Sequence, residues 1–211
     1  MRNKSNQIEA VKILCRQTFH RLRCFIDKRI DRKTSVIGLD IGRHSIKAVQ
    51  VEHEGGRPTL VRSSLAAIEG DPADKNKILE SLNKALAGMN KQDAQIMAVI
   101  NCPETCTRSI IVPHMPKHEL AQAIRWEAKN VIPYSIETAA MDFKVWGEVL
   151  ENGVKKLSVV MAASPKETVQ QMVSLCSGAG RELSALIPVS AAHQNLLAHL
   201  DRKSTRLNSS H

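Results

Sequence analysis

Residues 35–101 combine short apolar runs with one helical repeat. Four runs predict strands, which cover residues 35–41, 46–52, 58–63 and 95–101. A helix is predicted from Asp71-Pro72 to about Met89, because apolar residues recur there every three or four positions. The two short connections predict an antiparallel meander. The helical crossover predicts that the fourth strand runs parallel to a neighbour.

A second alternation of strands and helices follows over residues 102–182. Strands are predicted at 107–112, 141–149 and 154–163, and a helix at 117–131. Asn152-Gly153 is a strong hairpin signal between the last two strands. Ser164-Pro165-Lys166-Glu167 resembles a capping box with proline at the first helical position, and it predicts a helix that ends near Gly178 and Gly180. A short strand at 183–187 and a helix after Pro188 complete the pattern.

These patterns divide the chain into five sections and place it in the α/β class. Residues 1–34 are a basic amphipathic extension, 35–101 and 102–182 are α/β units, 183–200 return to the first unit, and 201–211 are a polar tail. Apolar residues recur at helical spacing in 1–34 with basic residues between them. Such a helix contacts an anionic membrane surface or a partner, or packs on its own domain.

The net charge of +9 alone would suggest nucleic acid as a partner, but the excess positive charge lies at the two ends of the sequence. Residues 1–34 hold ten Lys/Arg and three Asp/Glu, and residues 201–211 hold three and one. Residues 35–200 therefore carry 17 basic and 17 acidic side chains. With a neutral body and few aromatic residues, no nucleic-acid partner is predicted.

The distribution of apolar residues and cysteines predicts a cytoplasmic location. No stretch approaches the roughly 18 consecutive apolar residues of a membrane span. The first ten residues are polar and are not followed by the cleavage site of a signal peptide. Five cysteines, an odd number, are expected to be reduced thiols.

The segment of 38–47, Gly-Leu-Asp-Ile-Gly-Arg-His-Ser-Ile-Lys, carries the most chemistry. Gly42 allows close approach of a phosphate and offers an amide, and Ser45 offers a hydroxyl. Lys47 adds positive charge, whereas Asp40 would act on phosphate only through a water molecule bound to Mg²⁺. Taken alone, the motif is a weak signal for nucleotide, because a Gly-Asp-Gly hairpin also occurs as a plain structural turn.

This motif resembles the first phosphate motif of the actin, Hsp70 and sugar-kinase superfamily. Three blocks, 36–52, 115–134 and 160–200, together resemble the PilM family of type IV pilus assembly proteins. The resemblance implies an FtsA-like fold: an actin-like (ribonuclease H-like) first lobe with an inserted small α/β subdomain at about 102–182, truncated before the second lobe. Family members have small hydroxyl residues where this chain has Arg43 and His44, although Arg43 can still pair with phosphate.

The same resemblance implies ligands, partners and a location. The cofactors would be ATP and Mg²⁺, at a site that is incomplete in this chain and includes Asp40, Gly42, Arg43, Ser45 and Lys47. The partners would be the cytoplasmic tail of a PilN-like inner-membrane protein, held in a groove, and other pilus assembly proteins. The location would be cytoplasmic and peripheral at the inner membrane, with 1–34 as a possible membrane contact.

Residues 201–211, Asp-Arg-Lys-Ser-Thr-Arg-Leu-Asn-Ser-Ser-His, resemble the translation of a sequencing-library adapter. The alternative is a genuine polar tail. On the first reading, the gene fragment ends near Leu200, and the second phosphate loop and the adenosine-binding lobe of the family are missing.

A few other side chains have the chemistry of a metal site or a partner contact. Cys102, Cys106, His114 and His118 suggest zinc, but their spacing is short for a zinc finger and prolines interrupt it. Trp126 and Trp146 lie off the apolar stripes, either as partner anchors or covered by a neighbouring element. Glu127 is expected on a solvated helix face, and no catalytic residues are predicted.

Three functions stay open. The first is an assembly scaffold that binds ATP with slow or no turnover. The second is a small-molecule kinase of the same superfamily, for which the sequence offers no evident base. The third is an adaptor without nucleotide, which Arg43-His44 favours.

Overall fold

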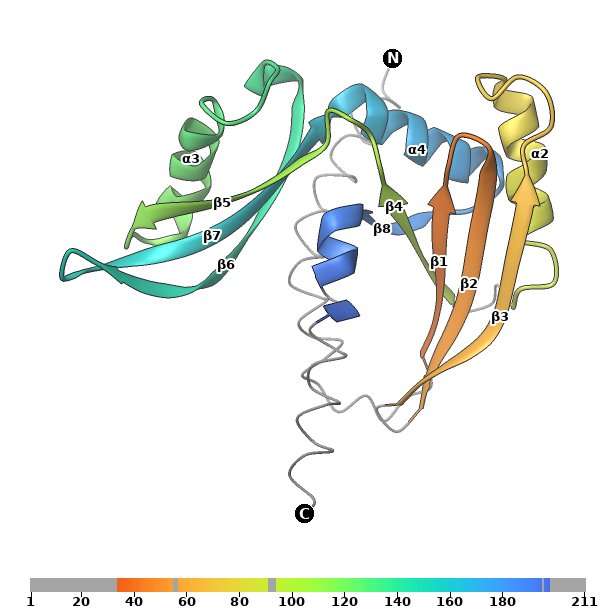
Figure 1. The fold of residues 1–211 in the computed structure, drawn as a ribbon, viewed down its shortest axis with the longest axis horizontal. Coiled ribbons are helices and arrows are strands. Elements are labelled where there is room, and N and C mark those ends of the chain that lie inside the picture. The colour runs from red at the N-terminus through yellow and green to blue at the C-terminus, as the bar shows by residue number, and fades with distance from the viewer. Residues whose placement is uncertain (1–33, 55–56, 91–93, 195, 198–211) are drawn as a thin grey trace.

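The computed structural model describes residues 34–54, 57–90, 94–194 and 196–197, which form two β-sheets with helices packed on them (Figure 1). The predicted extension, apart from Thr34, and the predicted tail 201–211 lie outside the described residues. None of the helices that the structure describes combines the length and apolar character that a bilayer span needs.

The larger sheet has the strand order β3-β2-β1-β4-β8. Its strands are β1 (Thr34–Ile41), β2 (Ser45–Glu54), β3 (Arg57–Ala67), β4 (Ala94–Ile100) and β8 (Leu183–Pro188). β1, β2 and β3 form an antiparallel meander, and β4 runs parallel to both β1 and β8. Both predictions for the order and direction of these strands are confirmed.

Helix α2 (Lys75–Ala85) begins later than predicted. Asp71 does not open the helix, because its carboxylate accepts a hydrogen bond from the Ala73 amide in a preceding turn, at 2.8 Å. Asp74 takes the capping position instead and accepts from the Asn76 amide, also at 2.8 Å. The helix also ends at Ala85 rather than near Met89.

The smaller sheet lies between β4 and β8 in sequence and has the order β5-β7-β6, all antiparallel. Its elements are β5 (Cys106–Pro113), α3 (Lys117–Ala128), the short 3₁₀ helix η1 (Ile136–Thr138), β6 (Ala139–Glu151) and β7 (Val154–Pro165). Asn152 and Gly153 both have positive φ, 53° and 77°, as the predicted hairpin turn requires.

A separate core holds this smaller unit together. One face of α3 packs on one face of the sheet, and the buried members of this core are Val112, Leu120, Ile124, Ala128, Ile132, Ile136, Ala139, Leu157, Val159, Met161 and Ala163. The three strands and α3 therefore have their own apolar layer, distinct from the core under the larger sheet.

Helix α4 (Lys166–Gly178) follows β7 without the predicted capping box, so that prediction is wrong. β7 continues to Pro165, which pairs with Ala139 and precedes the first turn of α4. Ser164 is therefore an extended, buried strand residue. Its hydroxyl makes a hydrogen bond with the Thr105 hydroxyl, at 3.0 Å, and caps no helix.

Helix α4 packs on the larger sheet, although its place in the sequence assigns it to the smaller unit. It belongs to the predicted section 102–182, yet its fully buried Cys176 lies in the core of the larger sheet. Its Gly178 faces Leu79 of α2 so closely that a Cβ there would lie 3.1 Å from a Leu79 methyl group. α2 and α4 thus cover the same apolar side of the larger sheet.

Gln50 is a buried polar link inside the larger unit. Its side chain is 1% exposed and donates to the Ser35 hydroxyl, at 2.9 Å, and to the Asn90 carbonyl, at 3.0 Å. Its amide oxygen accepts from the Asn90 N–H, also at 3.0 Å. β2 is thereby tied to β1 and to the chain beyond α2.

We predict that Gln50→Ala lowers the free energy of unfolding by about 2 kcal/mol, because it removes the hydrogen bonds that the buried Gln50 side chain makes with Ser35 and Asn90. Urea denaturation measures this change. The matched control, Gln122→Ala on the exposed side of α3, is expected to change the free energy by less than about 0.5 kcal/mol. Equal effects of the two substitutions would contradict the prediction.

Candidate functional site

The predicted phosphate motif forms the turn between β1 and β2. The Gly42 amide donates to the Ser45 carbonyl at 3.0 Å, and the His44 carbonyl accepts from the Ile68 amide at 2.9 Å. A Cβ on Gly42 would lie 3.0 Å from the Ser45 carbonyl oxygen, so this tight turn requires glycine. The Arg43 and His44 side chains are exposed at its tip.

Asp40 and Lys47 lie directly opposite each other on β1 and β2. Lys47 Nζ is 2.9 Å from Asp40 Oδ2, and both side chains are partly exposed, so this ion pair contributes little to stability. The structure therefore gathers all five predicted residues in one hairpin. Their chemistry fits a hydrated Mg²⁺ at Asp40 and phosphate at Ser45, Lys47 and Arg43.

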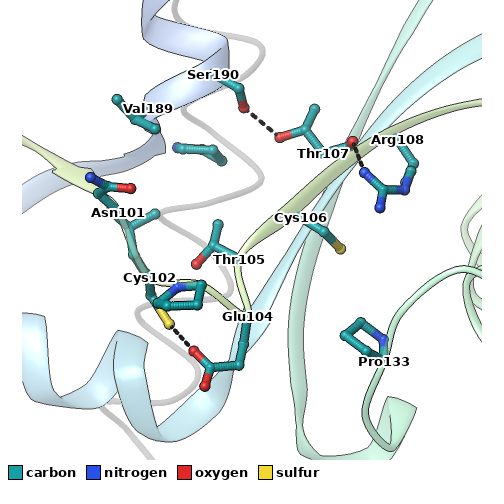
Figure 2. A pocket seen from close by; sticks show the side chains of 13 residues that line it. Asn101, Cys102, Glu104, Thr105, Cys106, Thr107, Arg108, Pro133, Val189 and Ser190 are labelled. Carbon is teal, nitrogen blue, oxygen red and sulfur yellow. Dashed lines mark hydrogen bonds between the residues drawn. The ribbon is translucent and has the colours of Figure 1, made fainter.

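A pocket of about 340 Å³ lies where the two units meet, and no pattern in the sequence predicts it (Figure 2). Four chain segments line it: the end of β4 with the following turn, the start of β5, the loop before η1, and the residues after β8. The lining residues are Ile100, Asn101, Cys102, Pro103, Glu104, Thr105, Cys106, Thr107, Arg108, Pro133, Pro188, Val189 and Ser190.

One side-chain hydrogen bond spans this pocket. Thr107 Oγ1 on β5 lies 2.8 Å from Ser190 Oγ, in the helical segment that follows β8, as Figure 2 shows. It joins the edge of the smaller unit to the larger one. Because both hydroxyls are partly open to solvent, the bond is weak enough to exchange for contacts with a bound molecule.

Two charged residues line the pocket. Cys102 Sγ donates to Glu104 Oε2 at 2.6 Å, and this hydrogen bond lowers the pKa of the Glu104 carboxyl, so Glu104 is ionised at neutral pH. Arg108 on β5 donates through Nη1 to the carbonyl of Thr107 at 3.1 Å. The pocket thus has a negative group in the turn before β5 and a positive group on β5.

Tyr134 adds an unsatisfied donor beside the pocket, next to Pro133. Its hydroxyl is buried and has no hydrogen-bond partner among the described residues. Burial, and secondarily the neighbouring thiol of Cys106, raise the pKa of Tyr134 far above its usual range. The hydroxyl therefore keeps its proton.

The four residues of the zinc pattern do not converge. Cys102 and Cys106 lie at the pocket end of β5, whereas His114 follows its other end, about 25 Å away along an extended strand. His114 lies 3.6 Å from Glu148, and His118 lies 3.4 Å from Glu119 on α3. No group of three metal-binding side chains occurs among the residues that the structure describes.

Both tryptophans lie on the surface of the smaller unit. Trp126 on α3 is 67% exposed and Trp146 on β6 is 66% exposed, so neither is covered by a neighbouring element. Lys129 lies over the Trp126 ring at 4.4 Å, and Lys144 lies over the Trp146 ring at 5.4 Å. Glu127 is exposed, as predicted.

The fold and the hairpin define the class of protein: an α/β, actin-like first lobe that carries a smaller α/β unit between β4 and β8. Residues 38–192 match the family described as type IV pilus assembly protein PilM. This match covers more than half of the chain, and the chain belongs to that family.

A solved structure agrees with this assignment. The chain is similar to a chain of the PilM-PilN type IV pilus biogenesis complex, with 26% identity and a TM-score of 0.56 over 77% of this chain. It spans 47% of that chain. It is also similar to the cytoplasmic domain of EpsL, an inner-membrane component of the type II secretion system of Vibrio cholerae. That match has 10% identity and a TM-score of 0.47, over 74% of this chain and 57% of that one.

We predict that Cys102 and Cys176 differ strongly in reactivity. Cys102 is half-buried in the open pocket, whereas Cys176 is fully buried and burial raises the pKa of its thiol to about 11. In the native protein at pH 8, iodoacetamide should alkylate Cys102 at least about tenfold faster, because the thiolate is the nucleophile. Peptide mapping by mass spectrometry measures both rates, and urea should remove the difference.

Proposed function

We propose that this protein is a cytoplasmic scaffold of type IV pilus assembly that binds the cytoplasmic tail of a PilN-like inner-membrane protein. The observation that carries this proposal is the pocket between the two units, in a chain that belongs to the PilM family. A molecule seated there contacts both units at once. Binding can therefore fix their relative position and report it to other pilus assembly proteins.

The lining of the pocket suits a short peptide segment. Ile100, Pro133 and Val189 offer apolar contact, and Asn101 offers an amide side chain for hydrogen bonds to a peptide backbone. Pockets that bind peptides commonly combine apolar surface with a few such polar groups.

We further propose that the β1–β2 hairpin binds the phosphates of ATP. Lys47 and Arg43 would supply positive charge, Ser45 a hydroxyl donor, and Asp40 would hold a water molecule of Mg²⁺. The bound nucleotide would supply a large anion that competes with Asp40 for Lys47. It would serve as a conformational ligand, with slow or no turnover.

An adaptor that binds the partner without nucleotide is the second candidate. Two contacts of the hairpin favour this candidate. Lys47 is already paired with Asp40, and the Gly42 amide already donates to the Ser45 carbonyl, so these groups have partners without nucleotide. The exposed Arg43 and His44 side chains also make the turn bulkier than a small hydroxyl residue would.

We predict that Val189→Arg, which places a bulky charge in the pocket, weakens binding of a purified PilN-type partner by about tenfold or more. Isothermal titration calorimetry on the full-length protein measures the affinity. Val154→Arg is the matched control, because Val154 is exposed at the far hairpin of the smaller unit. The proposal fails if the wild-type protein does not bind the partner, or if both substitutions weaken binding equally.

We predict that millimolar Mg-ATP raises the melting temperature of the full-length protein by a few degrees, because a ligand that binds only the folded state stabilises it. Lys47→Ala should remove most of the increase, whereas Lys155→Ala, on the exposed surface of the smaller unit, should leave it unchanged. If the wild-type protein shows no increase, the adaptor without nucleotide is supported.

A further inference from the structure

We infer that the partner tail binds as an extended segment along the open edge of β5, with an acidic side chain at Arg108 and a basic side chain at Glu104. This inference rests on the proposed function of the pocket and specifies how the pocket recognises its partner. It makes Arg108 and Glu104 the residues that determine specificity.

The strand order makes β5 the available edge. β5 is outermost in the order β5-β7-β6, so one side of its backbone pairs with no described strand. β8 is the outermost strand of the larger sheet, but its end in the pocket is Pro188, which has no N–H to donate. An extended peptide gains backbone hydrogen bonds by joining an open strand edge, and here β5 offers that edge.

Three consecutive residues at the start of β5 line the pocket: Cys106, Thr107 and Arg108. The pocket and the open strand therefore coincide. The Thr107 carbonyl accepts from Arg108 of the same strand, at 3.1 Å. A backbone N–H of an added segment could replace this donor, and the guanidinium would then be free to pair with a carboxylate of the segment.

The charges of the pocket run along the direction of the strand. Glu104 precedes β5 and Arg108 is its third residue, so at most about 14 Å of chain separates them. Neither residue forms an ion pair with another described residue. An extended segment crosses this distance in about four residues. The expected partner sequence therefore carries an acidic and a basic residue three or four positions apart.

Fluorescence polarisation with overlapping labelled peptides from the tail of a PilN-type partner tests this inference on the full-length protein. Arg108→Glu and Glu104→Lys should each weaken the best peptide about tenfold, because each places like charges in contact. Reversing the acidic residue of that peptide should restore binding to Arg108→Glu. Lys155→Glu is the control for net charge, since Lys155 is exposed away from the pocket.

A second measurement needs no variant of the protein. Methylation of single backbone nitrogens of the best peptide should weaken binding at alternate positions, because every second N–H of an added strand faces β5. If Arg108→Glu fails to fold, as judged by circular dichroism, Arg108→Gln and the methylated peptides still decide the outcome.

The outcomes separate the two proposals. If no tail peptide binds the wild-type protein, the proposed function fails. If a peptide binds but neither charge substitution nor methylation affects it, the proposed function stands and the strand-edge inference is wrong. If the charge substitutions weaken binding but methylation of the peptide does not, the segment binds in the pocket without joining β5, and the inference is again overturned.

Discussion

The parallel pairing of β4 with β8 is the constraint on which the rest of this structure depends. The two strands are neighbours in the larger sheet, yet residues 101–182 lie between them in sequence. Closing so long a connection is entropically costly unless the connection folds, and here it forms a sheet with its own core. Because the two strands are parallel, their C-terminal ends, Ile100 and Pro188, lie side by side, and the pocket lies at that end of the sheet.

The α4 helix shows how the two units are coupled. It begins directly after β7 of the smaller sheet and ends with Cys176 in the core of the larger one. A helix that starts in one unit and packs in the core of the other joins the two units through buried contacts. The Thr107–Ser190 hydrogen bond is a second, weaker link between the two units.

Local signals predicted most of the fold. The meander, the parallel return of β4 and the Asn152-Gly153 hairpin follow from turn residues and connection lengths, which depend on near neighbours in the chain. The helix starts were less predictable. Asp71 and Asp74 compete for the same capping role, and Ser164 is drawn into β7 by pairing with β6, a tertiary contact that no local motif records.

The two candidate sites also differ in how far the sequence alone could predict them. The 38–47 motif could be found because its residues are consecutive, whereas the pocket joins residues near 101, 133 and 189 that only the fold brings together. Cys102 and Cys106 stand out in the sequence only as part of a metal pattern with His114 and His118. Their actual neighbours, Glu104, Tyr134 and Thr168, are side chains that a spacing rule for metals does not consider.

The chain has only two tryptophans, Trp126 and Trp146, and both lie exposed on the smaller unit. Their emission in the folded state is therefore already that of indoles in contact with water. Unfolding of the larger sheet would change this signal little, so intrinsic fluorescence is a poor reporter of global denaturation here. The same exposure makes tryptophan emission an optical reporter for any molecule that covers α3 at Trp126 or β6 at Trp146.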